Sequence, residues 1–108
     1  MVIVTYDLLY NLNQLREVKN LLDEVLSNFD NVGVYINRNY RNGIIRKFSE
    51  EGVAIIYGDN TASFIIDAER SITVRKAVDK IAVFAYGEFT REEVKRQLCF
   101  FSELLNKL

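Results

Sequence analysis

The segment from Leu12 to Phe29 reads LNQLREVKNLLDEVLSNF, and its apolar residues recur at intervals of three and four. That spacing places them on one side of an α-helix and leaves the charged residues elsewhere on its surface. The apolar stripe consists of Leu12, Leu15, Val18, Leu21, Leu22, Val25, Leu26 and Phe29. The pattern predicts a long amphipathic helix over residues 12–29, which needs a partner layer to bury its stripe.

A second long helix is predicted at the other end of the chain, over residues 91–107. Thr90 and Glu93 have the T-x-x-E spacing of a capping box, in which each side chain bonds a backbone N–H of the first turn. The apolar stripe that follows consists of Val94, Leu98, Phe101 and Leu105, widened by Leu104 and Leu108. Phe100 and Phe101 are consecutive, so they cannot both point along this narrow stripe. Either one ring is exposed, or the helix buries a broader face that includes both.

Apolar and β-branched runs between the helices predict strands. Val2–Tyr6 is a short β-branched run, and Val53–Tyr57 and Ala82–Tyr86 are continuous apolar runs typical of central strands. Residues 32–36 instead alternate, with Val32, Val34 and Ile36 on one side, as in a half-buried strand.

The remaining middle segments are ambiguous. Residues 61–66 fit a strand or one face of a helix, and β-branching favours the strand. Val74, Ala77, Val78 and Ile81 have the spacing of a short helix. Residues 44–48 fit a strand or one helical turn, and residues 49–52 are a polar loop.

Two amphipathic helices and four to six strands predict an α+β fold of two layers. The expected sheet is mixed or mainly antiparallel and is covered by the helices over residues 12–29 and 91–107. The chain has 108 residues, no proline and no linker-like stretch, so residues 1–108 are expected to form one domain.

The composition excludes several classes of protein. The 14 basic and 15 acidic side chains give a net charge of −1, which excludes a strongly polybasic, histone-like protein. The absence of histidine and the single cysteine, Cys99, exclude histidine catalysis and zinc sites built from thiolates or imidazoles. We therefore predict a protein that is not an enzyme and holds no cofactor or metal. No apolar run is long enough to cross a bilayer and no signal peptide is recognisable, so a cytoplasmic protein is expected.

Basic side chains are concentrated around one turn-like stretch, NRNYRNG, at residues 37–43. Arginine and lysine bind phosphate, and an exposed tyrosine stacks on a base for about 1–3 kcal/mol. The stretch therefore predicts contact with nucleic acid, the alternative being a solvated hairpin turn around Asn42-Gly43. The candidate contact residues are Arg38, Tyr40, Arg41, Arg46 and Lys47.

Carboxylates at the ends of predicted strands suggest a different function. Asp7, Asp59, Asp67 and Glu69 are of the kind that metal-dependent nucleases gather around Mg²⁺. Acidic pairs are also common in solvated loops, so a nuclease is the lesser alternative.

The order of elements resembles a known family. The motifs are Ala68-Glu69-Arg70-Ser71-Ile72, Ala77-Val78, Ile81–Tyr86 and Thr90–Leu98. In this order they look like the tRNA-binding accessory subunit of the KEOPS complex, the PRPK-binding protein family. The chain is shorter than that family usually is, and the family would make residues 61–69 helical.

The resemblance implies a non-catalytic accessory subunit that binds tRNA and the small kinase of a tRNA-modification complex. Arg70 and Ile72 are the positions that carry over, as contacts to the partner or to tRNA. The rival from another class is a small homodimeric interaction or structural protein with no nucleic-acid role.

Overall fold

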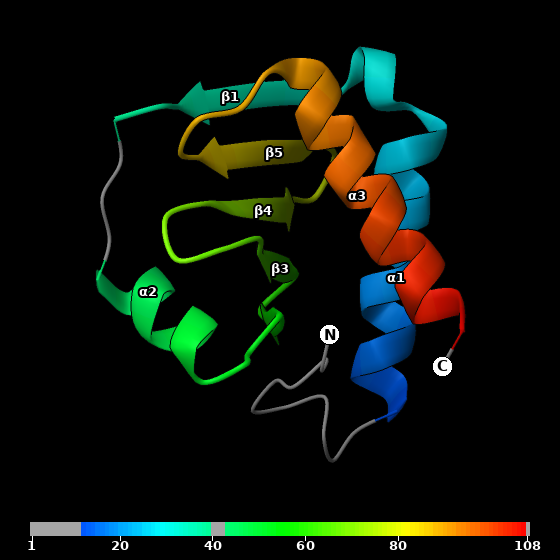
Figure 1. The fold of residues 1–108 in the computed structure, drawn as a ribbon. Coiled ribbons are helices and arrows are strands. Elements are labelled where there is room, and N and C mark those ends of the chain that lie inside the picture. The colour runs from blue at the N-terminus through cyan, green and yellow to red at the C-terminus, as the bar shows by residue number, and fades with distance from the viewer. Residues whose placement is uncertain (1–11, 40–42, 108) are drawn as a thin grey trace.

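The computed structural model describes residues 12–39 and 43–107, which form an α+β fold as the sequence predicts. The long helices α1 (Leu12–Ser27) and α3 (Arg91–Asn106) pack against each other, and the short helix α2 (Gly43–Glu50) lies apart from them (Figure 1). A single 3₁₀ turn, η1 (Phe29–Asn31), follows α1. No helix among these residues is long and apolar enough to cross a membrane.

In the described residues, five strands form one mixed sheet, in the order β1-β5-β4-β3-β2. Strands β2 to β5 follow one another as an antiparallel meander, and β1 pairs in parallel with β5. The strands are β1 (Gly33–Asn37), β2 (Ile55–Gly58), β3 (Thr61–Ile65), β4 (Ser71–Lys76) and β5 (Ile81–Tyr86). Among the described strands, β1 and β2 are therefore the two edges.

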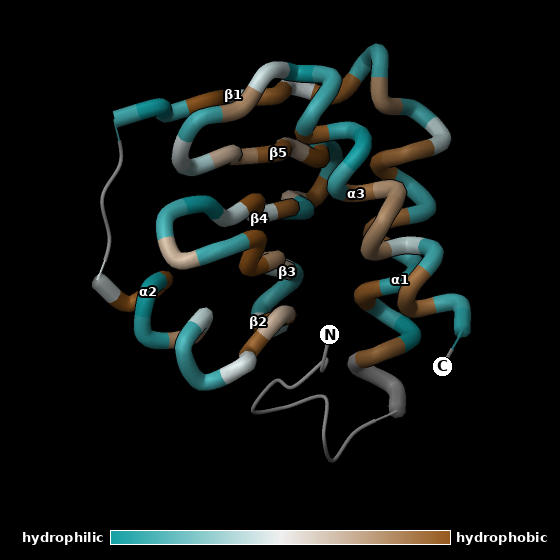
Figure 2. The backbone as a smooth tube through the Cα atoms, in the orientation of Figure 1, coloured by the Kyte–Doolittle hydropathy of each residue, from teal (hydrophilic) through white to brown (hydrophobic). Residues whose placement is uncertain are grey.

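The core lies between one face of this sheet and the helices α1 and α3. Phe64 of β3 packs on Phe101 of α3 with ring centroids 4.9 Å apart, and both side chains are buried. The register brings Val83 of β5 beside Val74 of β4 on the same face. Figure 2 shows the hydrophobic residues of the strands and of the two long helices that supply this core.

The prediction of a short helix over residues 74–81 is wrong. Residues 71–76 form β4, and residues 77–80 form the loop that leads into β5. Val74 is buried opposite Ala62 and Val83, so pairing on both sides outweighs the helical spacing. Val78, expected on an apolar helix face, is fully exposed in the loop.

The other ambiguous segments are settled as well. Residues 61–65 form a strand, in agreement with their β-branching and not with the helix that the family resemblance implies there. Residues 43–50 form a helix, so Ser49 and Glu50 belong to α2 and not to a polar loop, and Gly43 begins that helix and is not part of a hairpin turn. The strand predicted over Val2–Tyr6 lies outside the described residues.

The capping box predicted for the last helix is confirmed. The Thr90 hydroxyl accepts a hydrogen bond from the Glu93 N–H at 3.1 Å, and the Glu93 carboxylate accepts one from the Thr90 N–H at 3.1 Å. The following stripe is buried from Val94 to Leu105. Of the adjacent rings, Phe101 is buried and Phe100 is 45% exposed.

Changing Thr90 to alanine is therefore expected to reduce the free energy of unfolding by about 1 kcal/mol, because one helix-initiating N–H loses its acceptor. Urea denaturation followed by circular dichroism measures this. Thr90→Ser keeps the oxygen and is the control. A Thr90→Ala loss no larger than that of Thr90→Ser would contradict the role of the cap.

Candidate nucleic-acid interface

The second face of the sheet carries the side chains that alternate with those of the core. One row crosses all five strands, and its members are partly or fully accessible to solvent. The row consists of Tyr35, Phe84, Thr73, Ser63 and Ile56. We call this row the open face; Ile65 and Ser71, which lie on the same side of the sheet, are buried.

Two aromatic rings lie at one end of this row. Tyr35 of β1 and Phe84 of β5 are directly paired in the register, and their rings stack with centroids 5.4 Å apart and planes 22° apart. Tyr35 is 60% exposed although it is a large aromatic residue. Large aromatic rings are usually buried or in contact with a partner, so the exposed Tyr35 ring on the partly buried Phe84 indicates a contact surface.

Gly33 allows the Tyr35 ring to lie where it does. A Cβ atom at position 33 would lie 3.0 Å from the Tyr35 hydroxyl oxygen and 3.1 Å from a ring carbon. The ring therefore covers Gly33, next to Ala82 of β5 in the register. The missing side chain at position 33 fixes the place of the exposed ring.

Small polar residues continue the row away from the rings. The hydroxyl groups of Ser63 and Thr73 are 2.8 Å apart and share a hydrogen bond. Because both side chains are short, the middle of the open face is flat and offers polar groups beside the aromatic pair.

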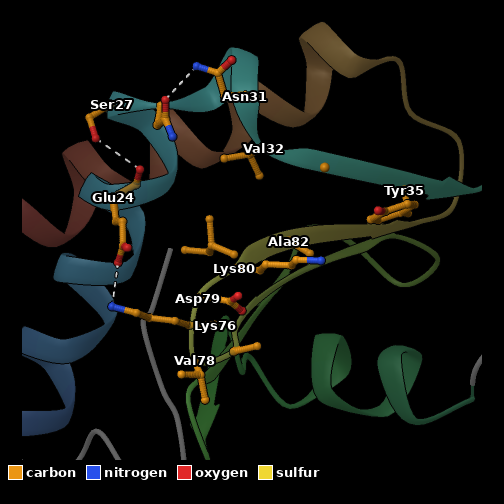
Figure 3. Close-up of a pocket in the computed structure, with 14 residues that line it drawn as sticks. Glu24, Ser27, Asn31, Val32, Tyr35, Lys76, Val78, Asp79, Lys80 and Ala82 are labelled. Atoms are coloured by element: carbon orange, nitrogen blue, oxygen red, sulfur yellow. Dashed lines mark hydrogen bonds and ion pairs between the residues drawn. The ribbon is translucent and has the colours of Figure 1, made fainter.

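Two cations flank the aromatic pair at the end of the sheet where β1 begins. Arg75 of β4 is exposed, pairs with Ala82 in the register and lies on the open face. Lys80 precedes β5, and Figure 3 shows its side chain extending toward Tyr35. Neither side chain takes part in an ion pair within residues 12–39 and 43–107.

The basic residues predicted from the sequence lie toward the opposite end of β1. Arg38 follows β1 directly, and its Nη2 donates a hydrogen bond to the Phe89 carbonyl oxygen at 3.2 Å. Arg46 of α2 lies 3.7 Å from the Glu69 carboxylate, with both side chains more than half exposed. Lys47 is exposed. Tyr40 and Arg41 lie outside the described residues.

The two residues carried over from the family resemblance have structural partners. Arg70 is 2.8 Å from the Asp67 carboxylate and 4.0 Å from that of Glu93, and its guanidinium lies over the Phe89 ring. Ile72 is fully buried in β4. Within the folded chain, both positions hold elements of this domain together.

The carboxylates considered for a nuclease are dispersed. Asp67 and Glu69 share the loop after β3, whereas Asp59 lies in the turn before it, at the other end of the strand. Partial burial opposes ionisation of Asp67, but the Glu69 N–H and the Arg70 guanidinium together hold the pKa of Asp67 below its usual value. In the described part of the chain, no three carboxylate or thiol groups gather as metal ligands. Asp7 lies outside it.

Comparison of the chain with protein-family models, curated protein sequences and solved structures gives no match. The open face, with its exposed Tyr35 ring, is the candidate surface for a function. Its aromatic pair was not predicted, although a signal is present: Tyr35 alternates with the inward-facing Val34 and Ile36. An aromatic residue at an outward position of an edge strand is the sign that could have marked the site.

Proposed function

We propose that the protein is a non-catalytic RNA-binding subunit whose open face holds an RNA segment. The observation that carries the proposal is the exposed Tyr35 ring, stacked on the partly buried Phe84, on a sheet whose other face forms the core. Bases stack on exposed aromatic rings irrespective of sequence. The pairing of β1 with β5 already places the two rings side by side, so little ordering of side chains is needed when RNA binds.

Cations at both ends of β1 support phosphate contacts. Arg75 and Lys80 lie at one end, and Arg38, Arg46 and Lys47 follow the other. Such a local concentration attracts a polyanion even though the chain has a net charge of −1. Phosphate contacts carry no sequence information, so the binding is expected to be weak, salt-dependent and tolerant of sequence.

Changing Tyr35 to alanine is expected to weaken binding of a short labelled single-stranded RNA about tenfold, because a stacked base loses its ring. Fluorescence anisotropy at fixed salt measures the affinity. Phe100→Ala removes an exposed ring from α3 and is the matched control, with no change expected. Equal affinities of the wild type and Tyr35→Ala would contradict stacking on this face.

Changing Arg38 and Arg41 together to alanine is expected to lower RNA affinity and to flatten its salt dependence by up to about two units of slope. Anisotropy titrations over a range of salt concentrations measure the slope. The control changes Arg16 and Arg96 to alanine, because both are exposed arginines, on α1 and α3, away from this stretch. An unchanged slope in Arg38→Ala/Arg41→Ala would mean that this stretch is a solvated connection with no phosphate contact.

A protein partner is the second part of the proposal, and the family resemblance supports it by implying the small kinase of a tRNA-modification complex. Co-elution of the purified chain with such a kinase tests this part. Sedimentation of the chain alone tests the rival homodimer. Mg²⁺-dependent RNA cleavage that is lost in Asp67→Asn would instead establish the nuclease.

A further inference from the structure

A groove of about 800 Å³ lies beside Tyr35, at the end of the sheet where β1 begins (Figure 3). One wall is the C-terminal part of α1 together with η1, and the other is the loop that joins β4 to β5. Lys76 Nζ lies 3.0 Å from Glu24 Oε2, and this ion pair spans the two walls at one side of the groove. Tyr35 lines the opposite side, as Figure 3 shows.

Amide and hydroxyl groups line the helical wall. Asn31 Nδ2 donates a hydrogen bond to Asn28 Oδ1 at 2.9 Å, and the Ser27 hydroxyl donates one to the Glu24 carbonyl oxygen. An asparagine side chain has two donor hydrogens and an acceptor oxygen. The Asn28–Asn31 bond uses one group of each residue, so both amides keep further donors or acceptors for a ligand.

The charges of the groove are balanced. Glu24 pairs with Lys76, and Asp79 stands next to Lys80 in the loop. A site for an isolated phosphate requires an excess of positive charge, which this lining lacks. Apolar surface from Val32 and Ala82 lies beside the polar groups. A neutral, planar, polar ring matches this lining, and the volume is within the range of small-ligand sites.

We propose that the groove takes one nucleobase, that of the nucleotide adjacent to the base stacked on Tyr35. This inference rests on the proposed RNA-binding function and extends it. The side chain of Lys80 extends from the groove toward Tyr35, between the two positions proposed for the bases (Figure 3). One base lies on the open face and the next enters the groove, so neither can pair with a second strand. The ligand is therefore an unpaired RNA segment.

Filling the groove tests the proposal. Ser27→Phe introduces a ring from the α1 wall, and Ala77→Trp introduces one from the loop wall. Asn20→Phe places the same ring on an exposed position of α1 that does not line the groove, so it is the matched control. Thermal unfolding establishes that each variant is folded.

The affinity for a short labelled RNA is measured by anisotropy, as a single strand and as a blunt duplex. The wild type is expected to bind the single strand about ten times more tightly than the duplex. Both groove-filling variants should bind the single strand about tenfold more weakly than the wild type, whereas Asn20→Phe should bind it as the wild type does. In NMR titrations with adenosine monophosphate, backbone amides of residues 28–31 and 77–80 should shift in the wild type and not in Ser27→Phe.

The outcomes separate the two proposals. If the wild type binds no RNA in either form, the proposed function fails and the groove assignment fails with it. If Tyr35→Ala weakens binding but the groove-filling variants bind as the wild type does, the groove assignment is overturned and the RNA-binding function stands. Equal binding of single strand and duplex by the wild type likewise overturns the groove assignment.

Discussion

Replacing Phe64 by alanine is expected to lower the free energy of unfolding by about 3–5 kcal/mol. The Phe64 side chain is fully buried on the core face of β3 and packs on Phe101 of α3. Its removal leaves a cavity between the sheet and the helix, which the other strands cannot fill without shifting. A domain of this size is stable by only about 5–15 kcal/mol, so the substitution removes a large share of the total stability.

Urea denaturation monitored by circular dichroism checks this expectation. Phe100→Ala is the matched control, because the same change at a ring that is 45% exposed and packs edge-on against Phe101 should cost clearly less, about 1–2 kcal/mol. Losses of similar size at the two positions would contradict the packing of α3 against β3.

Replacing Gly87 by alanine is expected to cost about 3 kcal/mol of stability, from backbone strain and from a steric clash together. Gly87 has a backbone φ of +115°, a conformation that residues with a Cβ atom rarely adopt. A Cβ there would lie 2.7 Å from the Arg70 side chain and 2.9 Å from the Glu69 carbonyl oxygen. The carbonyl belongs to the backbone, so the clash is not relieved by a rotation of one side chain.

Gly52→Ala separates the two contributions. Gly52 also has a positive φ, +77°, but a Cβ there would meet no atom within 4 Å. Gly52→Ala should therefore lower the free energy of unfolding by about 1 kcal/mol, from backbone strain alone. Thermal or urea unfolding of both variants gives the comparison, and equal losses would mean that the loop around Arg70 gives way easily.

Much of the fold could be predicted because its long elements have strong periodicity. The apolar stripes of α1 and α3 extend over several turns, and the Thr90–Glu93 pair marks the start of α3. The segment from Val74 to Ile81 was misassigned because four apolar residues at helical spacing also fit a strand followed by a loop. The strand-pairing partners of Val74, Ala62 and Val83, decide in favour of the strand, and they belong to the preceding and following strands.

The site was harder to predict than the fold. Arg38 and Arg46 stand out as charges in the sequence, but their neighbours Phe89 and Glu69 are known only once the chain is folded. Phe84 lies within a continuous apolar run, which gave no reason to place it on an open face. Only the strand order brings it beside Tyr35, because β1 and β5 are far apart in the chain.

β1 joins the sheet through a pairing that links Gly33 to Ala82, roughly fifty residues along the chain, whereas β2, β3 and β4 each pair with the next strand in sequence. Closing the longer loop costs more chain entropy, so the meander is expected to assemble first and β1 to dock late. An edge strand that docks late is also among the first to detach in the native state. Amide hydrogens of β1 should then exchange faster than those of β4, and RNA bound to Tyr35 should slow that exchange.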